Sequence, residues 1–316
     1  MLSIRPLSSY CAVALAATLP LLAVGAPFAY VPNEGSGSIS VIDTASDLVV
    51  ADIPAGKKPR GIAVGAHWLY VSDQPNNRLQ LIDIKLRTAG TTIAVGDSPE
   101  GVSISRDGRW VVTAIEEKNE IALTDTSSNK VAFSISVKGK NPEHAVFSPD
   151  GRSIFVSAEE GDAVDVIDFA SRKQVAQVAV GARPRGIGFL PDSSRAYVAT
   201  ENGNEVFVIE TRNYAILARI KAGLRSNGIA VHPDGSRVYV SNGGAANVSV
   251  IDTASNQIIA TVPAGERPWN MALTPDGKKL YVANGRSNSV SVIDTVNNVK
   301  LRDVAVGKLP WGVVIK

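Results

Sequence analysis

Seven loops of the pattern Gly-x-x-Pro-x-Gly place a different functional side chain at one repeated position. That position follows the proline, or Ser226 in one copy, and we call its occupants the ring residues: Arg60, Glu100, Glu143, Arg185, Asn227, Trp269 and Trp311. The next position is glycine in five copies but His144 and Asn270 in the other two. Arginine forks recognise carboxylates, and tryptophan is enriched at binding hot spots. These nine residues are therefore the candidate site for a ligand or partner.

Each of these residues also has a structural interpretation, and the sequence leaves both open. The charged ring residues pair with one another as a self-satisfied ring, or they offer recognition of a carboxylate. Trp269 and Trp311 plug a channel, or they form an aromatic wall for a planar or anionic group. His144 is a polar rim residue, or it joins Arg60, Glu143 and Arg185 in a lactonase-type hydrolase.

A second set of loops, which we call the rim loops, is expected on the same face: 33–38, 74–77, 116–120, 159–162, 201–205, 243–247 and 285–289. Three consecutive rim loops are acidic, with Glu116, Glu117, Glu120, Glu159, Glu160, Asp162, Glu201 and Glu205. One interpretation is that these acidic residues are simply solvated loop charges. The alternative is that they form an acidic arc that binds a basic partner or a hard cation. No calcium-loop spacing supports a metal, and we predict none.

Several familiar chemistries have no motif in this chain. It lacks Cys-x-x-Cys-His for haem, His/Cys spacing for a transition metal, a phosphate-binding glycine loop and a Gly-x-Ser-x-Gly nucleophile elbow. The single cysteine, Cys11, lies near the N-terminus. We therefore predict no catalytic residues and no cofactor.

The loops belong to a repeat that determines the fold. A hydrophobic tripeptide ending in an acid recurs from Val41-Ile-Asp43 to Val292-Ile-Asp294 at intervals of 40 to 43 residues. Such a period without helical patterning is typical of four-stranded propeller blades. Within one unit we expect strands at 228–231, 237–241, 247–252 and 257–265, separated by Pro-Asp-Gly and Asp-Thr-Ala-Ser-Asn turns.

The two ends of the repeat region predict how the ring closes. The N-terminal part opens with a second strand at 29–31, and the C-terminal part ends with an innermost strand at 312–315. Three N-terminal strands and one C-terminal strand would share a blade, so that no sheet edge stays open. We predict an all-β fold, a seven-bladed β-propeller of four-stranded antiparallel blades, in one domain spanning 27–316.

The repeats resemble a known family. AYVPNEGSGSISVID at 29–43 and LYVANGRSNSVSVIDT at 280–295 resemble the YVTN-type propeller repeat over essentially the whole of 27–316. Seven units ending in LPWGVVI resemble, more narrowly, the propellers associated with pyrroloquinoline-quinone (PQQ)-dependent alcohol catabolism, which are encoded beside transport components. The resemblance implies an accessory role there. The larger eight-bladed quinoprotein dehydrogenases carry a metal site and tryptophan-docking repeats that this chain lacks, so we expect no bound quinone.

The N-terminal residues predict export. Arg5 is followed by an apolar run at 10–24 and then by small residues, as in a secretory signal peptide at 1–26 cleaved between 25 and 29. Pro20 interrupts the run, so we expect no membrane insertion once the signal is removed. With a formal net charge of +2, the chain has no general attraction for nucleic acid.

These features predict a periplasmic, non-enzymatic recognition or scaffold propeller, monomeric, that binds a small anionic molecule or an exported protein such as a dehydrogenase or transport component. The first alternative is a lactonase-type propeller hydrolase. A nucleic-acid-binding propeller is the second, disfavoured by the near-neutral charge and the acidic rim loops.

Overall fold

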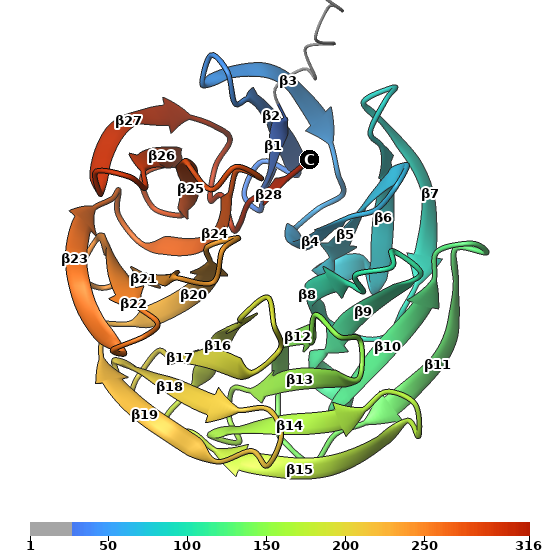
Figure 1. Cartoon of the computed structure of the whole chain (residues 1–316). Helices are drawn as coiled ribbons and strands as arrows, with labels where there is room; N and C mark the ends of the chain where they lie inside the picture. The colour runs from blue at the N-terminus through green and yellow to red at the C-terminus, as the bar shows by residue number, and fades with distance from the viewer. Residues whose placement is uncertain (1–26) are drawn as a thin grey trace, which may run out of the picture.

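The computed structural model describes residues 27–316, so the predicted signal peptide lies outside the described residues. Residues 27–316 form seven four-stranded antiparallel sheets arranged as blades around a central axis (Figure 1). The predicted seven-bladed β-propeller is confirmed. Among these residues no helix has the length and apolar character needed to cross a membrane.

In every blade the strands are ordered from the axis outward. Blades 1 to 3 contain β4 (Pro59–Val64), β5 (Trp68–Asp73), β6 (Arg78–Asp83), β7 (Thr88–Ala94); β8 (Pro99–Ile104), β9 (Trp110–Ile115), β10 (Glu120–Asp125), β11 (Lys130–Ser136); β12 (Pro142–Phe147), β13 (Ser153–Ala158), β14 (Ala163–Asp168) and β15 (Lys173–Ala179). Blades 4 to 6 contain β16 (Pro184–Phe189), β17 (Arg195–Thr200), β18 (Glu205–Glu210), β19 (Ile216–Lys221); β20 (Ser226–Val231), β21 (Arg237–Asn242), β22 (Asn247–Asp252), β23 (Gln257–Pro263); β24 (Pro268–Leu273), β25 (Lys279–Asn284), β26 (Ser289–Asp294) and β27 (Val299–Ala305). Blade 7 contains β28 (Val314–Ile315), β1 (Phe28–Asn33), β2 (Ser38–Asp43) and β3 (Leu48–Pro54), and the 3-10 helices η1 (Gln74–Asn76) and η2 (Glu116–Lys118) lie in rim loops.

The two ends of the ring meet in blade 7, as the sequence predicts. Strand β28 pairs antiparallel with β1, with Tyr30 opposite Val314. The Phe28 amide donates to the Lys316 carbonyl at 2.7 Å, and the Lys316 amide donates to the Phe28 carbonyl at 3.0 Å. Residues from opposite ends of the chain therefore share one sheet and close the ring.

Buried tyrosines join neighbouring blades. The second strands carry Tyr30, Tyr70, Tyr197, Tyr239 and Tyr281, each 2% exposed or less. The Tyr70 hydroxyl donates to Asn129 in the outer turn of the next blade at 3.0 Å, and Tyr197 does the same to Asn256 at 3.0 Å. Both asparagines have a positive φ, which asparagine tolerates better than most residues. The outer turns that contain Asn129 and Asn256 thus contribute to packing between blades.

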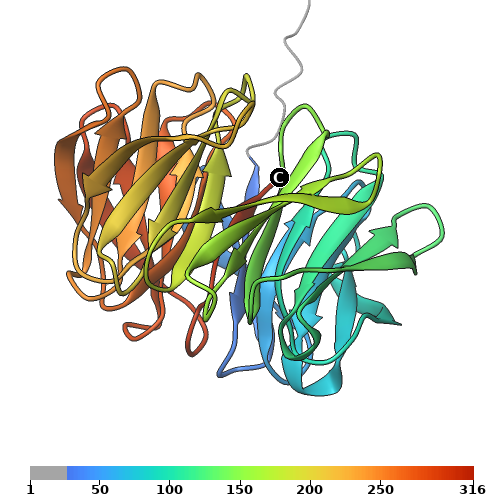
Figure 2. The same ribbon diagram turned by 90° about the horizontal axis from the view of Figure 1, so that it is seen from below.

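The seven Gly-x-x-Pro-x-Gly loops, which we call the inner loops, lie on the same face of the ring as the rim loops. Figure 2 shows the loops at the two faces. Main-chain hydrogen bonds join them directly. The Glu201 amide donates to the Arg183 carbonyl at 2.8 Å, and the Gly243 amide donates to the Arg225 carbonyl at 2.8 Å. The side chains of both loop sets therefore converge near the axis.

Closure by β28 predicts that a truncated protein loses cooperative folding. Deleting 308–316 removes β28, exposes the inner edge of β1 and takes Trp311 out of the ring, which alone costs about 3–5 kcal/mol. We expect a broad, non-cooperative or aggregating transition in differential scanning calorimetry. Lys316→Ala, which keeps β28, is the control and should melt cooperatively. A truncated protein that melts like the full chain contradicts the closure role.

Candidate functional site: two chambers on the propeller axis

A β-bulge at the start of the innermost strand directs each ring residue toward the axis. In β4, Pro59 pairs with Asp73 and Ile62 with Val71, so Arg60 and Gly61 together lie opposite one residue, Ser72. Bulges of this kind re-aim side chains and leave an unpaired amide. The Ser72 hydroxyl accepts a hydrogen bond from the Gly61 amide at 2.8 Å. The bulge is thereby satisfied without ladder pairing.

Close packing of the innermost strands explains the glycine after each ring residue. A Cβ atom at Gly61 would lie 2.1 Å from the Glu100 carbonyl oxygen, and one at Gly228 would lie 2.5 Å from the Trp269 carbonyl oxygen. Real Cβ atoms do not approach this closely, so the backbone of the next blade excludes other residues there. His144 is accommodated because β12 leaves only Glu143 unpaired, and His144 itself pairs with Ser157.

His144 and Trp311 divide the space on the axis. Their rings stack at a centroid distance of 5.4 Å and an interplanar angle of 17°, although they come from blades 3 and 7. Asn270 holds the Trp311 main chain, since the main-chain amide of Asn270 donates to the Trp311 carbonyl at 3.3 Å. Trp311 is only 8% exposed. The stacked pair separates a lower chamber of about 90 Å³ from an upper cavity of about 190 Å³.

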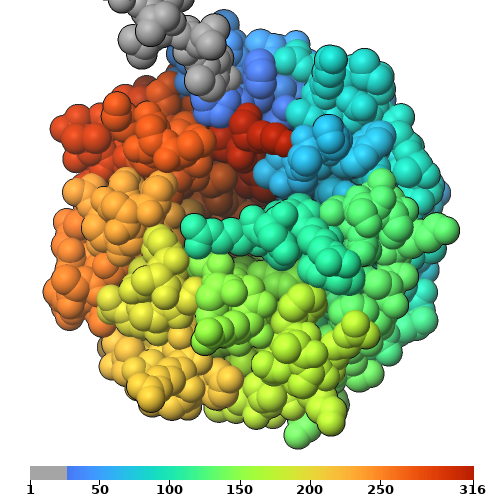
Figure 3. Space-filling view, turned by 45° about the vertical axis from the view of Figure 1, so that its right-hand side comes forward, coloured from blue at the N-terminus to red at the C-terminus, as the bar shows by residue number. Residues whose placement is uncertain are grey.

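The upper cavity opens among the inner loops and the rim loops. It is lined by Arg60, Glu116, Glu143, Glu159, Arg183, Arg185, Asn227, Arg267, Trp269 and Trp311. Figure 3 shows mainly the opposite face of the ring, where the C-terminal residues, in red, lie beside a hollow at the centre. Six predicted site residues thus line one cavity. Glu100 is buried behind it, and His144 and Asn270 line the lower chamber.

Glu201 is the centre of a buried charge network on one side of the cavity. Its side chain is fully buried and accepts hydrogen bonds from Arg185 at 2.9 Å, Arg225 at 3.0 Å and Arg267 at 2.9 Å. Burial acts to raise the pKa of Glu201, but Arg185 and Arg267 outweigh it and hold the pKa below its ordinary value. Glu201 therefore stays ionised and neutralises the surrounding guanidinium groups.

Arg60 and Arg185, the predicted anion-binding arginines, are already paired. Arg60 contacts Glu34 at 3.2 Å and also Glu100, while Arg185 contacts Glu143 at 2.6 Å and Glu159 at 3.0 Å. Burial would lower the pKa of each guanidinium, but the surrounding carboxylates raise it above its ordinary value. Both arginines remain charged, and their charge is matched within the protein.

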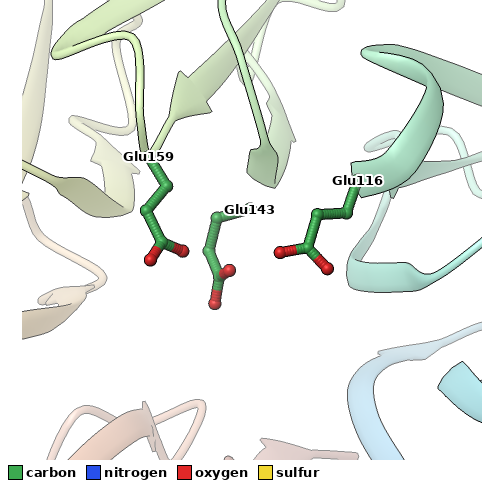
Figure 4. Close-up of side chains that lie close together, drawn as sticks. All are labelled: Glu116, Glu143 and Glu159. Atoms are coloured by element: carbon green, nitrogen blue, oxygen red, sulfur yellow. The ribbon is translucent and has the colours of Figure 1, made fainter.

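Three glutamates meet at the other side of the cavity (Figure 4). Oxygens of Glu116, Glu143 and Glu159 lie within 4.8 Å of one another, which is close enough to hold a cation. Burial, together with the Glu143 carboxylate, raises the pKa of Glu159 to about 7. Burial also acts to raise the pKa of Glu143, but Arg185 and His144 lower it below its ordinary value. The raised pKa of Glu159 and the contacts of Arg185 with Glu143 and Glu159 reduce the repulsion within this cluster.

The remaining wall of the cavity carries a single charged group, Arg267, beside uncharged residues. Asn227 is 5% exposed and lines the cavity. Trp269 is partly exposed and lies 6.5 Å from Trp311, ring centroid to centroid, at 59°. The Arg267 guanidinium lies 5.8 Å from the Trp269 ring centroid. The ring of Trp269 and the side-chain amide of Asn227 therefore lie opposite the wall of ion-paired residues.

Three arginines of the site were not identified from the sequence: Arg183, Arg225 and Arg267. Each directly precedes the proline or Ser226 of its inner loop, and each has a positive φ of 61°, 56° and 56°, respectively. Their position in three consecutive blades, opposite acidic rim loops, is the signal that could have identified them. They also correct the picture of an exposed acidic arc, because they hold Glu159 and Glu201 in ion pairs below the surface.

Fold and site together define a seven-bladed propeller with a blocked channel and a polar cavity at one end. The family model described as YNCE-like beta-propeller matches residues 4–316, so the chain belongs to this family. No functionally curated protein matches the sequence.

Solved structures agree on the fold. Hydrazine synthase from Kuenenia stuttgartiensis is similar at a TM-score of 0.78 and 24% identity, over 90% of this chain and 99% of that chain. A protein of unknown function from Desulfotomaculum acetoxidans gives 0.80 and 20%, over 91% and 98%. A proposed 6-phosphogluconolactonase from Bacteroides uniformis gives 0.75 and 19%, over 92% and 99%. At these identities the likeness shows the fold alone.

The burial of the two tryptophans predicts different effects on stability. Trp311→Ala removes a nearly buried ring and its stack on His144, so we expect a loss of about 3–5 kcal/mol and a fall in melting temperature of roughly 6 °C or more. Trp269→Ala is the matched control and should lower the melting temperature much less, since Trp269 is partly exposed. Equal effects in thermal melts contradict the assignment of Trp311 as the floor of the cavity.

The raised pKa of Glu159 predicts a pH-dependent change in stability. Between its ordinary value of 4.5 and about 7, the folded protein holds a proton there that the unfolded chain releases. This stabilisation is present below about pH 4.5 and is lost as the pH rises through about 7. Glu159→Gln removes the effect, so its unfolding free energy relative to wild type should increase from about pH 5 to about pH 8 in urea denaturation. Glu160→Gln, on the solvent side of the same loop, is the control, and a constant difference for Glu159→Gln contradicts the assignment.

Proposed function

We propose that this chain is a non-enzymatic, exported recognition propeller that binds a small polar molecule in the upper cavity. The observation that carries this proposal is the Asn227 side chain, which is only 5% exposed and lines the cavity together with Trp269 and Trp311. A side-chain amide that lines a cavity can both donate a hydrogen bond to a polar ligand and accept one from it. Trp269 supplies a partly exposed aromatic surface on the same wall.

The arrangement of the candidate catalytic residues favours binding over catalysis. Trp311 covers His144, which lines the lower chamber rather than the upper cavity. Burial lowers the pKa of His144, and neither ring nitrogen has a hydrogen-bond partner within 27–316. A general base must reach its substrate by a hydrogen bond or one water molecule. The lactonase-type alternative would require His144 to act from behind Trp311.

Export and the physiological context are part of the proposal. The signal-peptide pattern at 1–26 supports a periplasmic location, and the C-terminal LPWGVVI motif supports an accessory role in PQQ-dependent alcohol catabolism or associated transport. A dehydrogenase or transport component could then receive the ligand at the loop face. The pairing of Arg225 and Arg267 with the buried Glu201 weighs against nucleic-acid binding at this cavity, because these guanidinium groups are already neutralised.

Native mass spectrometry of protein purified from its own periplasm tests this function. We expect a retained small molecule, or a mass gain after incubation with periplasmic metabolites. Asn227→Ala combined with Trp269→Ala should abolish the gain, and Trp110→Phe, on the opposite face, is the matched control. Wild-type protein that gains no mass, or a double variant that gains as much as wild type, overturns the proposal.

A further inference from the structure

The contrast between the two walls of the upper cavity indicates which class of ligand binds there. This inference rests on the proposed function. Blades 5 to 7 contribute the uncharged residues Asn227, Trp269 and Trp311, and also Arg267, whose guanidinium pairs with Glu201 of blade 4. Blades 2 to 4 contribute carboxylates and guanidinium groups side by side, among them Glu116, Glu159 and Arg183. One wall therefore offers apolar ring surface and an amide, and the other offers closely spaced hydrogen-bond acceptors and donors.

The charges around the cavity are balanced before any ligand binds. The cations are Arg60, Arg183, Arg185, Arg225 and Arg267, and the carboxylates are Glu34, Glu100, Glu116, Glu143, Glu159 and Glu201. All five arginines are in ion pairs, and Glu116 accepts a hydrogen bond from Ser98 at 2.8 Å. Burial raises the pKa of Glu100 and of Glu159, which reduces the small excess of carboxylates.

A balanced site disfavours a ligand with net charge. An anion would face Glu116, Glu143 and Glu159, and it would have to displace a glutamate to pair with Arg60 or Arg185. A cation would meet the arginines that already neutralise these glutamates. A buried charge without its own partner is costly, whereas a neutral hydroxyl can donate to a carboxylate and accept from a guanidinium or amide.

The size of the cavity limits the ligand further. A volume of about 190 Å³ is the share of roughly six water molecules. This is less than the several hundred Å³ of a typical drug-sized pocket. It can enclose one small ring with its substituents and is too small to enclose a nucleotide or an extended peptide.

We propose that the upper cavity binds a small neutral polyhydroxylated molecule, a monosaccharide or a cyclic polyol. Its C–H face lies against Trp269. Its hydroxyl groups donate to Glu116 and Glu159 and accept hydrogen bonds from Asn227 and the neighbouring arginines. In this arrangement the Asn227 side-chain amide and the charged groups of the opposite wall each form a hydrogen bond with the ligand. The ligand buries no net charge.

Titration calorimetry with matched probes tests the ligand class. The neutral probes are glucose, galactose and myo-inositol, the charged analogues are gluconate and glucosamine, and calcium chloride tests the glutamate cluster. We expect at least one neutral probe to bind about tenfold or more tightly than both charged analogues, since a buried net charge costs well over 1.4 kcal/mol. Tighter binding of gluconate, glucosamine or calcium overturns the inference.

Variants test whether binding occurs in this cavity. Asn227→Ala and Trp269→Ala should each weaken the neutral probe about tenfold, while Trp110→Phe leaves its affinity unchanged. Circular dichroism and thermal melts check that each variant is folded, and Asn227→Asp, of nearly the same shape, should also weaken binding because it adds a charge. Unchanged affinity in folded variants overturns the location. If no neutral probe binds while native mass spectrometry detects another retained molecule, this inference fails and the recognition function stands.

Discussion

The close approach of seven innermost strands around one axis is the constraint on which the rest of the structure depends. The backbone of each strand lies against the next so tightly that a Cβ atom at Gly61 or Gly186 would fall within 2.6 Å of a neighbouring carbonyl oxygen. Glycine is the only residue that fits there, and the preceding bulge turns the ring residue toward the axis. The same packing that builds the core therefore produces a ring of side chains whose identity the fold does not restrict.

Freedom at the ring positions explains how this propeller places a charge network at its centre. An arginine or glutamate on one blade meets a partner from a neighbouring blade, as Arg185 meets Glu143 and Arg60 meets Glu100. Isolated charges at this depth would be destabilising, and one unpaired member would leave its partner buried. The ion pairs consequently couple blade 1 to blades 7 and 2, and blade 4 to blades 3, 5 and 6, in addition to the tyrosine–asparagine contacts between second strands and outer turns.

The fold could be predicted almost completely from the sequence because each of its signals is local. Pro-Asp-Gly turns, alternating strands and the Val-Ile-Asp repeat fix the strands within a few residues, and the strand at 312–315 identified the closing contact, although its regular part is only Val314–Ile315. Six of the nine candidate site residues line one cavity, because their equivalent positions in the repeat place them at the same level along the propeller axis. Contacts across the ring were not predictable in this way. The stacking of His144 on Trp311 joins blades 3 and 7, and the convergence of Arg225 and Arg267 on Glu201 depends on side-chain reach between blades.

Departures from the repeat are concentrated at one level of the axis. His144 and Asn270 replace the glycine that five copies retain, and Trp311 is one of two tryptophans among the ring residues. These three residues act together, because Asn270 holds the main chain of Trp311 and His144 covers its ring. A regular propeller would need none of them, since the other blades pack around the axis with glycine at the corresponding position. The floor of the upper cavity is thus made by the residues that break the repeat, which argues that the cavity is a built feature of this chain and not space left over from closing the ring.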